Sequence, residues 1–91
     1  MKTIQIDAQN MTSIEKSYSY LREQLHAPPW MGHNLDALWD MILSLNMEEP
    51  LHITLIHARA LPELLGEYGL RILDVFGDLQ EEGNLEIQIF W

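Results

Sequence analysis

The stretch that decides the fold is GHNLDALWD, residues 32–40. A glycine and Asn34, a favourable helix cap, precede apolar residues at helical spacing, which predicts a helix that begins after Asn34. The side of this helix expected to be buried holds Leu35, Leu38, Trp39 and Ile42. Asp36 and Asp40 share another side, one turn apart, where two like charges destabilise a helix by about 0.2–0.5 kcal/mol. Because the acidic pair destabilises the helix, its presence indicates a surface that binds a positively charged partner.

The remaining elements are predicted from hydrophobic periodicity and from turn residues. Strands are expected over residues 2–6, 51–56 and 85–90, and helices over residues 14–25, from 35 onward, 60–65 and 72–82. The run Thr12-Ser13-Ile14-Glu15 has the spacing of a capping box. Pro28-Pro29 forbids continuation of the first helix. Gly66 and Gly69 are expected to bracket a break, and Gly83 to end the last helix.

The order of these elements predicts an α/β fold in a single domain over residues 1–91. Helices between successive strands imply parallel strands joined by right-handed crossovers. The first and last strands alternate apolar with polar residues, so about four helices should cover only one face of a three-stranded parallel sheet, in two layers. Parallel sheets are usually covered on both faces, and this arrangement is therefore a departure.

The charge of the chain limits its partners. Fourteen acidic residues face five basic ones, for a net charge of −9. Such a field repels nucleic acid and anionic membranes and attracts basic partners, although acidity could also serve solubility alone. Cysteine is absent, which excludes disulfides and thiolate chemistry and fits a reducing compartment. No apolar run approaches the roughly 18 residues of a membrane span, and the N-terminus lacks a signal-peptide core. We therefore expect a cytoplasmic protein.

Catalytic and metal-binding motifs are not apparent in the sequence. The four histidines, His26, His33, His52 and His57, lack metal-ligand spacing. There is no nucleophile motif and no glycine-rich phosphate loop. We therefore expect no enzyme activity, no metal and no cofactor, and a small enzyme or metal protein without a known motif stays as a minor alternative.

Residues 34–40, NLDALWD, preceded by Gly32 and an aromatic-bearing loop, resemble the signature of the barstar family of intracellular ribonuclease inhibitors. The resemblance extends over nearly the whole chain, through Val75-Phe76, Glu82-Gly83 and the last strand. It implies a barstar-like fold and an inhibitor or immunity protein of the bacterial cytoplasm. The implied partner is a basic ribonuclease or ribonuclease toxin.

The resemblance also implies roles for three acids. Asp40 matches the residue that such an inhibitor inserts into the catalytic site of the ribonuclease, where it takes the place of a substrate phosphate. Asp36 matches a second acid that faces basic groups of the partner. Asp78 matches a glutamate that makes a flanking ion pair, and it is one methylene shorter.

The loop before the helix completes the implied binding edge. Trp30 stands at a tyrosine position that packs on the catalytic histidine of the partner, while Gly32 and Asn34 match positions that shape the edge. His33, also placed at this edge, replaces an acid and weakens the negative charge.

Other departures surround the same edge. Met31 replaces a second tyrosine, and residues 43–45 replace a Thr-Gly-Trp run. The central motif at residues 34–40 is kept, whereas the residues around it differ from the family pattern. This favours a target ribonuclease other than the one that the family is known to inhibit. The alternative is a non-inhibitory module that uses the acidic edge for another basic protein. We expect a monomer, with a weak dimer through Phe90 and Trp91 as the alternative.

Overall fold

A computed structural model of the chain describes residues 2–28, 30–82 and 85–91. Its elements, in chain order, are β1 (Lys2–Asp7), the short 3-10 helix η1 (Ala8–Asn10), α1 (Ile14–Gln24), α2 (Leu35–Glu48), β2 (Leu51–Ile56), α3 (Ala60–Leu65), α4 (Glu67–Glu82) and β3 (Glu86–Ile89). The predicted order of strands and α-helices is confirmed, and η1 is an addition that the sequence pattern did not predict. Pro29 and Gly83, the expected turn residues, lie outside the described residues.

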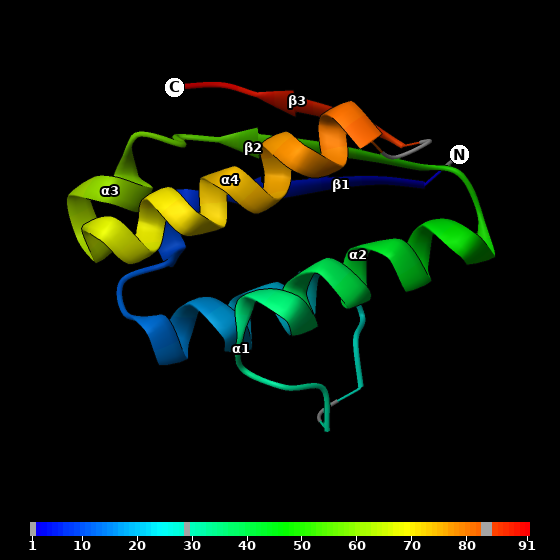
Figure 1. Cartoon of the computed structure of the whole chain (residues 1–91), viewed down its shortest axis with the longest axis horizontal. Coiled ribbons are helices and arrows are strands. Elements are labelled where there is room, and N and C mark those ends of the chain that lie inside the picture. The colour runs from blue at the N-terminus through cyan, green and yellow to red at the C-terminus, as the bar shows by residue number, and fades with distance from the viewer. Residues whose placement is uncertain (1, 29, 83–84) are drawn as a thin grey trace.

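The sheet has three parallel strands in the order β1-β2-β3. Each crossover advances by one strand in the same direction, and right-handed crossovers that advance in one direction leave their helices on the same face. In Figure 1 the strands run across the top and the helices gather below and in front of them. The uncovered face thus follows from the strand order.

Strand register aligns the apolar residues of the sheet into two rows. Ile4 pairs with Ile53, which pairs with Ile87, and the next row holds Ile6, Leu55 and Ile89. Five of these six side chains are buried and Ile89 is partly buried. The intervening positions, among them Thr3, Gln5, Thr54 and Gln88, are exposed or half-buried. This alternation confirms the predicted two-layer arrangement.

The start of α1 corrects the predicted capping box by one residue. Ser13, not Thr12, is the cap, and its hydroxyl accepts a hydrogen bond from the backbone N–H of Lys16 at 3.1 Å. Glu15 therefore comes one position too early to close the box. The helix ends as predicted near Leu25, where His26 adopts φ 53° and the N–H of Ala27 donates to the carbonyl of Arg22 at 2.9 Å. This left-handed residue turns the chain into the loop before α2.

The joint between α3 and α4 is shorter than the sequence indicates. Gly66 alone separates the two helices, with φ 61°, and its N–H donates to the carbonyl of Pro62 at 2.9 Å. Gly69, predicted to bracket the break, lies inside α4, which begins at Glu67. A Cβ at Gly69 would stand 2.0 Å from the carbonyl oxygen of Leu61. Gly69 thus permits close packing of the two helices.

The two glycines of α4 predict opposite effects of alanine. Gly69→Ala should destabilise the protein by about 1–3 kcal/mol, because the new methyl meets backbone that cannot move aside. Gly77→Ala should stabilise it by about 0.5–1 kcal/mol, because Gly77 has no positive φ and its added Cβ meets no described atom within 4 Å. Urea unfolding of the two variants beside the parent protein measures both, and equal effects would contradict the packing described.

Asp7, at the end of β1, contacts three other residues through its backbone and its side chain. Its backbone N–H donates to the Tyr20 hydroxyl at 2.8 Å, and its carboxylate accepts from the N–H of Gln9 at 2.9 Å. His57 Nδ1 lies 3.0 Å from the same carboxylate. Desolvation raises the pKa of Asp7, but the Gln9 hydrogen bond and the His57 contact outweigh it, so the pKa lies below the ordinary value of 3.8.

A carboxyl group whose pKa is lower in the folded state stabilises the protein at pH values above its unfolded-state pKa. This stabilisation is lost as the pH falls through the folded-state pKa. Asp7→Asn should therefore lower the melting temperature at pH 6, and the difference from the parent protein should shrink between pH 4 and pH 2. Paired thermal melts across this range test the claim. A difference that stays constant to pH 2 would show that the Asp7 carboxylate does not supply it.

Candidate functional site

Packing of α2 determines which of its side chains face outward. The buried residues of the helix are Leu38, Met41, Ile42 and Leu45. Leu35 and Trp39, predicted to be buried, are partly buried and pack against the core. Asp36 and Asp40 are exposed on the outward side. We call this pair of carboxylates the acidic edge. Because the opposite side of α2 is anchored in the core, the acidic edge is held on a rigid support.

The start of α2 is fixed by the cap predicted from the sequence. The side-chain oxygen of Asn34 accepts a hydrogen bond from the backbone N–H of Ala37 at 2.8 Å. Asp36 lies in the first turn, where the helix dipole stabilises a negative charge. Gly32 precedes the cap, and a Cβ there would lie 3.4 Å from the Cβ of Ala37. Gly32 therefore leaves room beside the first turn.

Both carboxylates of the acidic edge lack internal partners. Among residues 2–28, 30–82 and 85–91, neither Asp36 nor Asp40 makes a side-chain hydrogen bond or an ion pair. The sequence holds no lysine or arginine between Arg22 and Arg59. The edge therefore presents uncompensated negative charge, which attracts a basic surface.

The loop before α2 presents one large aromatic residue. Trp30 is 81 % exposed. The backbone beside it is turned by a hydrogen bond from the N–H of Met31 to the carbonyl of Pro28 at 3.1 Å. Tryptophan is enriched among the residues that contribute most to binding at protein interfaces. Trp30 is therefore accessible to a partner, and its contact role stays a prediction.

His33 makes contacts inside the protein that the sequence did not predict. Its Nε2 lies 3.2 Å from Nη1 of Arg22, and because a guanidinium only donates, Nε2 accepts this hydrogen bond. The ring of Tyr18 lies nearby, with centroids 6.2 Å apart. His33 thus ties the loop to α1. No sequence pattern pointed to Arg22, because the two residues are eleven positions apart.

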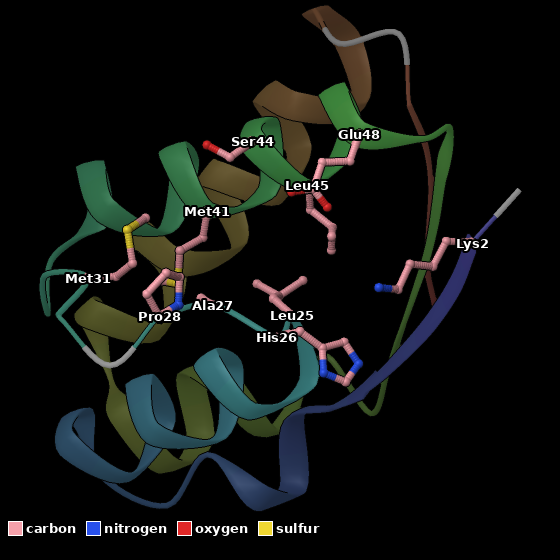
Figure 2. A pocket seen from close by; sticks show the side chains of 10 residues that line it. All are labelled: Lys2, Leu25, His26, Ala27, Pro28, Met31, Met41, Ser44, Leu45 and Glu48. Atoms are coloured by element: carbon pink, nitrogen blue, oxygen red, sulfur yellow. The ribbon is translucent and has the colours of Figure 1, made fainter.

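The outward side of α2 ends at a hollow of about 260 Å³. Ser44 and Glu48 continue the four-residue spacing of Asp36 and Asp40, and both line this hollow. Figure 2 shows its apolar walls, formed by the end of α1, the following loop and α2, with the side chain of Lys2 directed into it. The spacing alone could have identified Ser44 and Glu48. We call this feature the α2 hollow.

Two other kinds of site are not found among the described residues. No group of three or more histidines, aspartates and glutamates there could hold a metal ion. No helix in that part of the chain is long and apolar enough to cross a membrane.

Comparison with known proteins identifies the family of the chain. The family model described as Barstar (barnase inhibitor) matches residues 1–91, the whole chain. The chain belongs to the barstar family. A Bacillus subtilis (strain 168) protein named "Putative ribonuclease inhibitor YrdF" is 34 % identical over 89 residues, which cover 98 % of this chain and 97 % of that protein.

Asp78 lies apart from the segment that holds the other candidate residues. It is exposed on α4, which packs against α2, and it borders a second hollow near the C-terminus. In this barstar-family protein the loop and α2 thus bring together Trp30, Gly32, His33, Asn34, Asp36 and Asp40, while Asp78 stands on a neighbouring helix. No described contact joins Asp78 to the acidic edge.

The residues expected from the resemblance to depart from the family pattern take different places in the structure. Met31, Ser44 and Leu45 line the α2 hollow. Leu43 is partly buried against the core, and Leu45 is 8 % exposed. Leu43 and Leu45 therefore pack on the core, and Ser44 is exposed one turn after Asp40.

The cap at Asn34 predicts a measurable contribution to stability. Asn34→Ala should destabilise the protein by about 1 kcal/mol, because the N–H of Ala37 loses its acceptor. Asn34→Ser, which keeps a capping oxygen, should lie within a few tenths of a kcal/mol of the parent. Chemical unfolding of both variants gives the comparison. Equal stability of the alanine and serine variants would show that the hydrogen bond contributes nothing.

Proposed function

We propose that this protein inhibits a basic ribonuclease or ribonuclease toxin by placing the acidic edge of α2 in the cleft where the enzyme binds RNA. One observation carries the proposal: Asp40 is an exposed carboxylate with no partner among the described residues, on a helix whose other side is buried. Membership of the barstar family and the name of the Bacillus relative support the inhibitor class.

The chemistry of such a target favours a carboxylate plug. An enzyme that cleaves RNA must gather cations in its cleft to hold the phosphate backbone. A carboxylate that enters this cleft accepts short, charge-assisted hydrogen bonds from arginine, and these bonds can be bidentate. Asp40 would occupy the place of a phosphate, and Asp36, one turn earlier, would face basic groups at the rim of the cleft.

The fold lowers the cost of this interaction. Asp40 belongs to the second turn of a helix anchored by Leu38 and Ile42, both fully buried. A carboxylate held in place loses little freedom on binding, so more of its interaction energy appears as affinity. The uncompensated charge of the chain also accelerates encounter with a basic partner.

The surface around Asp40 bears on which ribonuclease is bound. Trp30 offers a large exposed ring before the start of α2, and the α2 hollow offers an apolar depression toward the other end of that helix. The ion pair proposed for Asp78 would come from α4. We propose that these features select a target other than barnase.

The test is ribonuclease inhibition with Asp40→Asn, which keeps the shape of the side chain and removes its charge. The purified protein is assayed against barnase and against ribonucleases encoded near its gene, with cleavage of a fluorescent RNA as the readout. For any enzyme that it inhibits, Asp40→Asn should weaken inhibition by at least about 30-fold, the equivalent of a hot spot of about 2 kcal/mol. The energy scale for such charge pairs was measured in part on a complex of this family, and the expected magnitude is carried over from that complex.

Two further variants serve as controls for the loss of inhibition. Glu63→Gln, which removes an exposed acid of α3, should leave inhibition within about twofold, because a single distant surface charge contributes little. Asp36→Asn should fall between the two. Equal inhibition by Asp40→Asn and the parent protein would disprove the phosphate-mimic mechanism. Tight binding of a basic protein that has no nuclease activity would favour the alternative, a non-inhibitory binding module.

A further inference from the structure

The outer side of β1 is an edge of the sheet, because the strand order is β1-β2-β3. The N–H of Lys2 donates to the carbonyl of Pro50 at 2.9 Å, on the side of β2. Since backbone groups alternate in direction along a strand, the N–H and carbonyl groups of Thr3, Gln5 and Asp7 point away from β2. We call this outward side of the strand the β1 edge.

The β1 edge is closed at its end but not in its middle. The outward N–H of Asp7 donates to the hydroxyl of Tyr20 at 2.8 Å. In the part of the chain that the structure describes, no hydrogen bond reaches the outward backbone groups of Thr3 or Gln5, and both residues are exposed. Each of these residues has one donor and one acceptor, so the middle of the edge can pair with a further strand.

The opposite edge of the sheet, on β3, is better protected. The N–H of Phe90 donates to the carbonyl of Leu55 at 2.8 Å, so Phe90 points toward β2. By alternation, the backbone groups of Ile87 and Ile89 point outward. The carbonyl of Ile87 accepts a hydrogen bond from the side-chain amide of Gln80 at 2.6 Å, and both isoleucines are at least partly buried. Because proteins usually cover or blunt their strand edges, the uncovered middle of the β1 edge indicates a surface that binds a partner.

A groove of about 580 Å³ runs along the β1 edge, with α1 and the residue after its end as the other wall. This volume lies within the range of sites that hold ligands. Figure 2 shows the side chains of Lys2 and His26, which line both this groove and the α2 hollow, directed toward one another. The polar side chains that line the groove include Thr3, Gln5, Asp7, Tyr20, Gln24 and His26. We call this feature the β1 groove, and its polar lining suits a peptide backbone better than an apolar ligand.

We propose that the β1 edge pairs with an extended segment of a basic protein, which lies in the β1 groove as a fourth strand. Strand addition takes its affinity from main-chain hydrogen bonds and its selectivity from the side chains that alternate along the added strand. The segment would exchange hydrogen bonds with Thr3 and Gln5 and would have no proline at the paired positions.

The charge of the chain selects the charge of the segment. The net charge is −9, and the two residues in the middle of the edge, Thr3 and Gln5, have neutral side chains. Lys2, the lysine that borders the groove, directs its ammonium group into the α2 hollow (Figure 2). A segment with positive side chains is therefore attracted. The inference does not rest on the proposed function, because backbone pairing requires no nuclease.

Two other occupants fit the β1 groove less well. A second copy of the chain would bring together two molecules of net charge −9, which repel each other. The middle of the edge also offers two residues, whereas stable interfaces take roughly 20–30 residues from each side. A purely apolar segment would cover polar side chains such as Gln24 and Asn10 without giving them partners.

The test uses the full chain and a defined peptide. The probe is an acetylated and amidated pentapeptide of alternating threonine and lysine, and hydrogen exchange of backbone amides is followed by NMR. In the free protein the amides of Thr3 and Gln5 should exchange faster than those of Ile4 and Ile6, which face β2. Saturating peptide should slow exchange at Thr3 and Gln5 by at least about fivefold and leave Ile4 and Ile6 within about twofold. Replacement of the lysines by glutamate should raise the dissociation constant at least about fivefold.

Methylated peptides separate strand pairing from attraction by charge. Methylation of alternate backbone nitrogens leaves one side of the peptide intact, so one of the two possible peptides should bind within about threefold of the parent probe. Methylation of every backbone nitrogen removes all the donors and should weaken binding at least about tenfold. Equal binding of the fully methylated peptide would show that the lysines alone hold the probe, and it would overturn the proposal.

Two variants of the protein test the same hydrogen bonds from the other side. Gln5→Pro removes an outward N–H and no hydrogen bond to β2, and proline is tolerated at such positions of edge strands. It should weaken peptide binding at least about fivefold, whereas Gln5→Thr, which keeps the N–H, should stay within about twofold. Melting temperatures show whether both variants fold, and the methylated peptides decide if Gln5→Pro does not.

Three further outcomes would overturn the proposal. The first is unchanged exchange at Thr3 and Gln5 in saturating peptide, and the second is equal affinity for the lysine and glutamate peptides. The third is slow exchange at these two amides that increases with protein concentration in the absence of peptide. That result would show that a second copy of the chain occupies the edge.

Discussion

Right-handed crossover between parallel strands is the constraint on which the arrangement of this molecule depends. Because β1, β2 and β3 follow one another in the same direction across the sheet, all four α-helices lie on one face. This places α2 and α4 side by side, with their apolar sides toward the same core. Their outward sides then form the protein surface, and the acids of both helices appear there.

The distribution of basic residues along the sequence makes this surface strongly negative. The long interval without lysine or arginine covers the loop and α2, and a second such interval follows Arg71. Two of the five basic side chains contact other residues of the fold: Arg22 contacts His33, and Arg71 pairs with Glu67. The negative field therefore is concentrated on α2 and on the outer side of α4. Self-repulsion of this kind costs stability, and the large shared core offsets it.

The sequence was sufficient for the parts of the structure that depend on local patterns. Strand alternation, the Asn34 cap and the order of elements predicted the parallel two-layer fold, and residues 34–40 located the acidic edge. Features that depend on contacts between distant residues were missed. The tie between His33 and Arg22, the packing of Gly69 on Leu61 and the hollow beside Trp91 each join segments that no periodicity relates.

Capping shows how a local signal can still mislead by one position. Thr12 and Ser13 both have capping hydroxyls, and only backbone geometry decides between them. The two glycines of α4 show the same limit in another form. The sequence predicted a break at Gly69 and a continuous helix through Gly77, whereas in the structure α4 contains both, and a Cβ at Gly69 would meet a carbonyl while one at Gly77 would meet open volume.

The unpaired carboxylates at Asp36 and Asp40 have a consequence for the response of the protein to ionic strength. In the free protein, added salt screens repulsion between neighbouring acids, so the folded state gains stability. For a basic partner the same screening removes attraction and slows association. Salt should thus act with opposite signs on folding and on complex formation, because both depend on the same two charges.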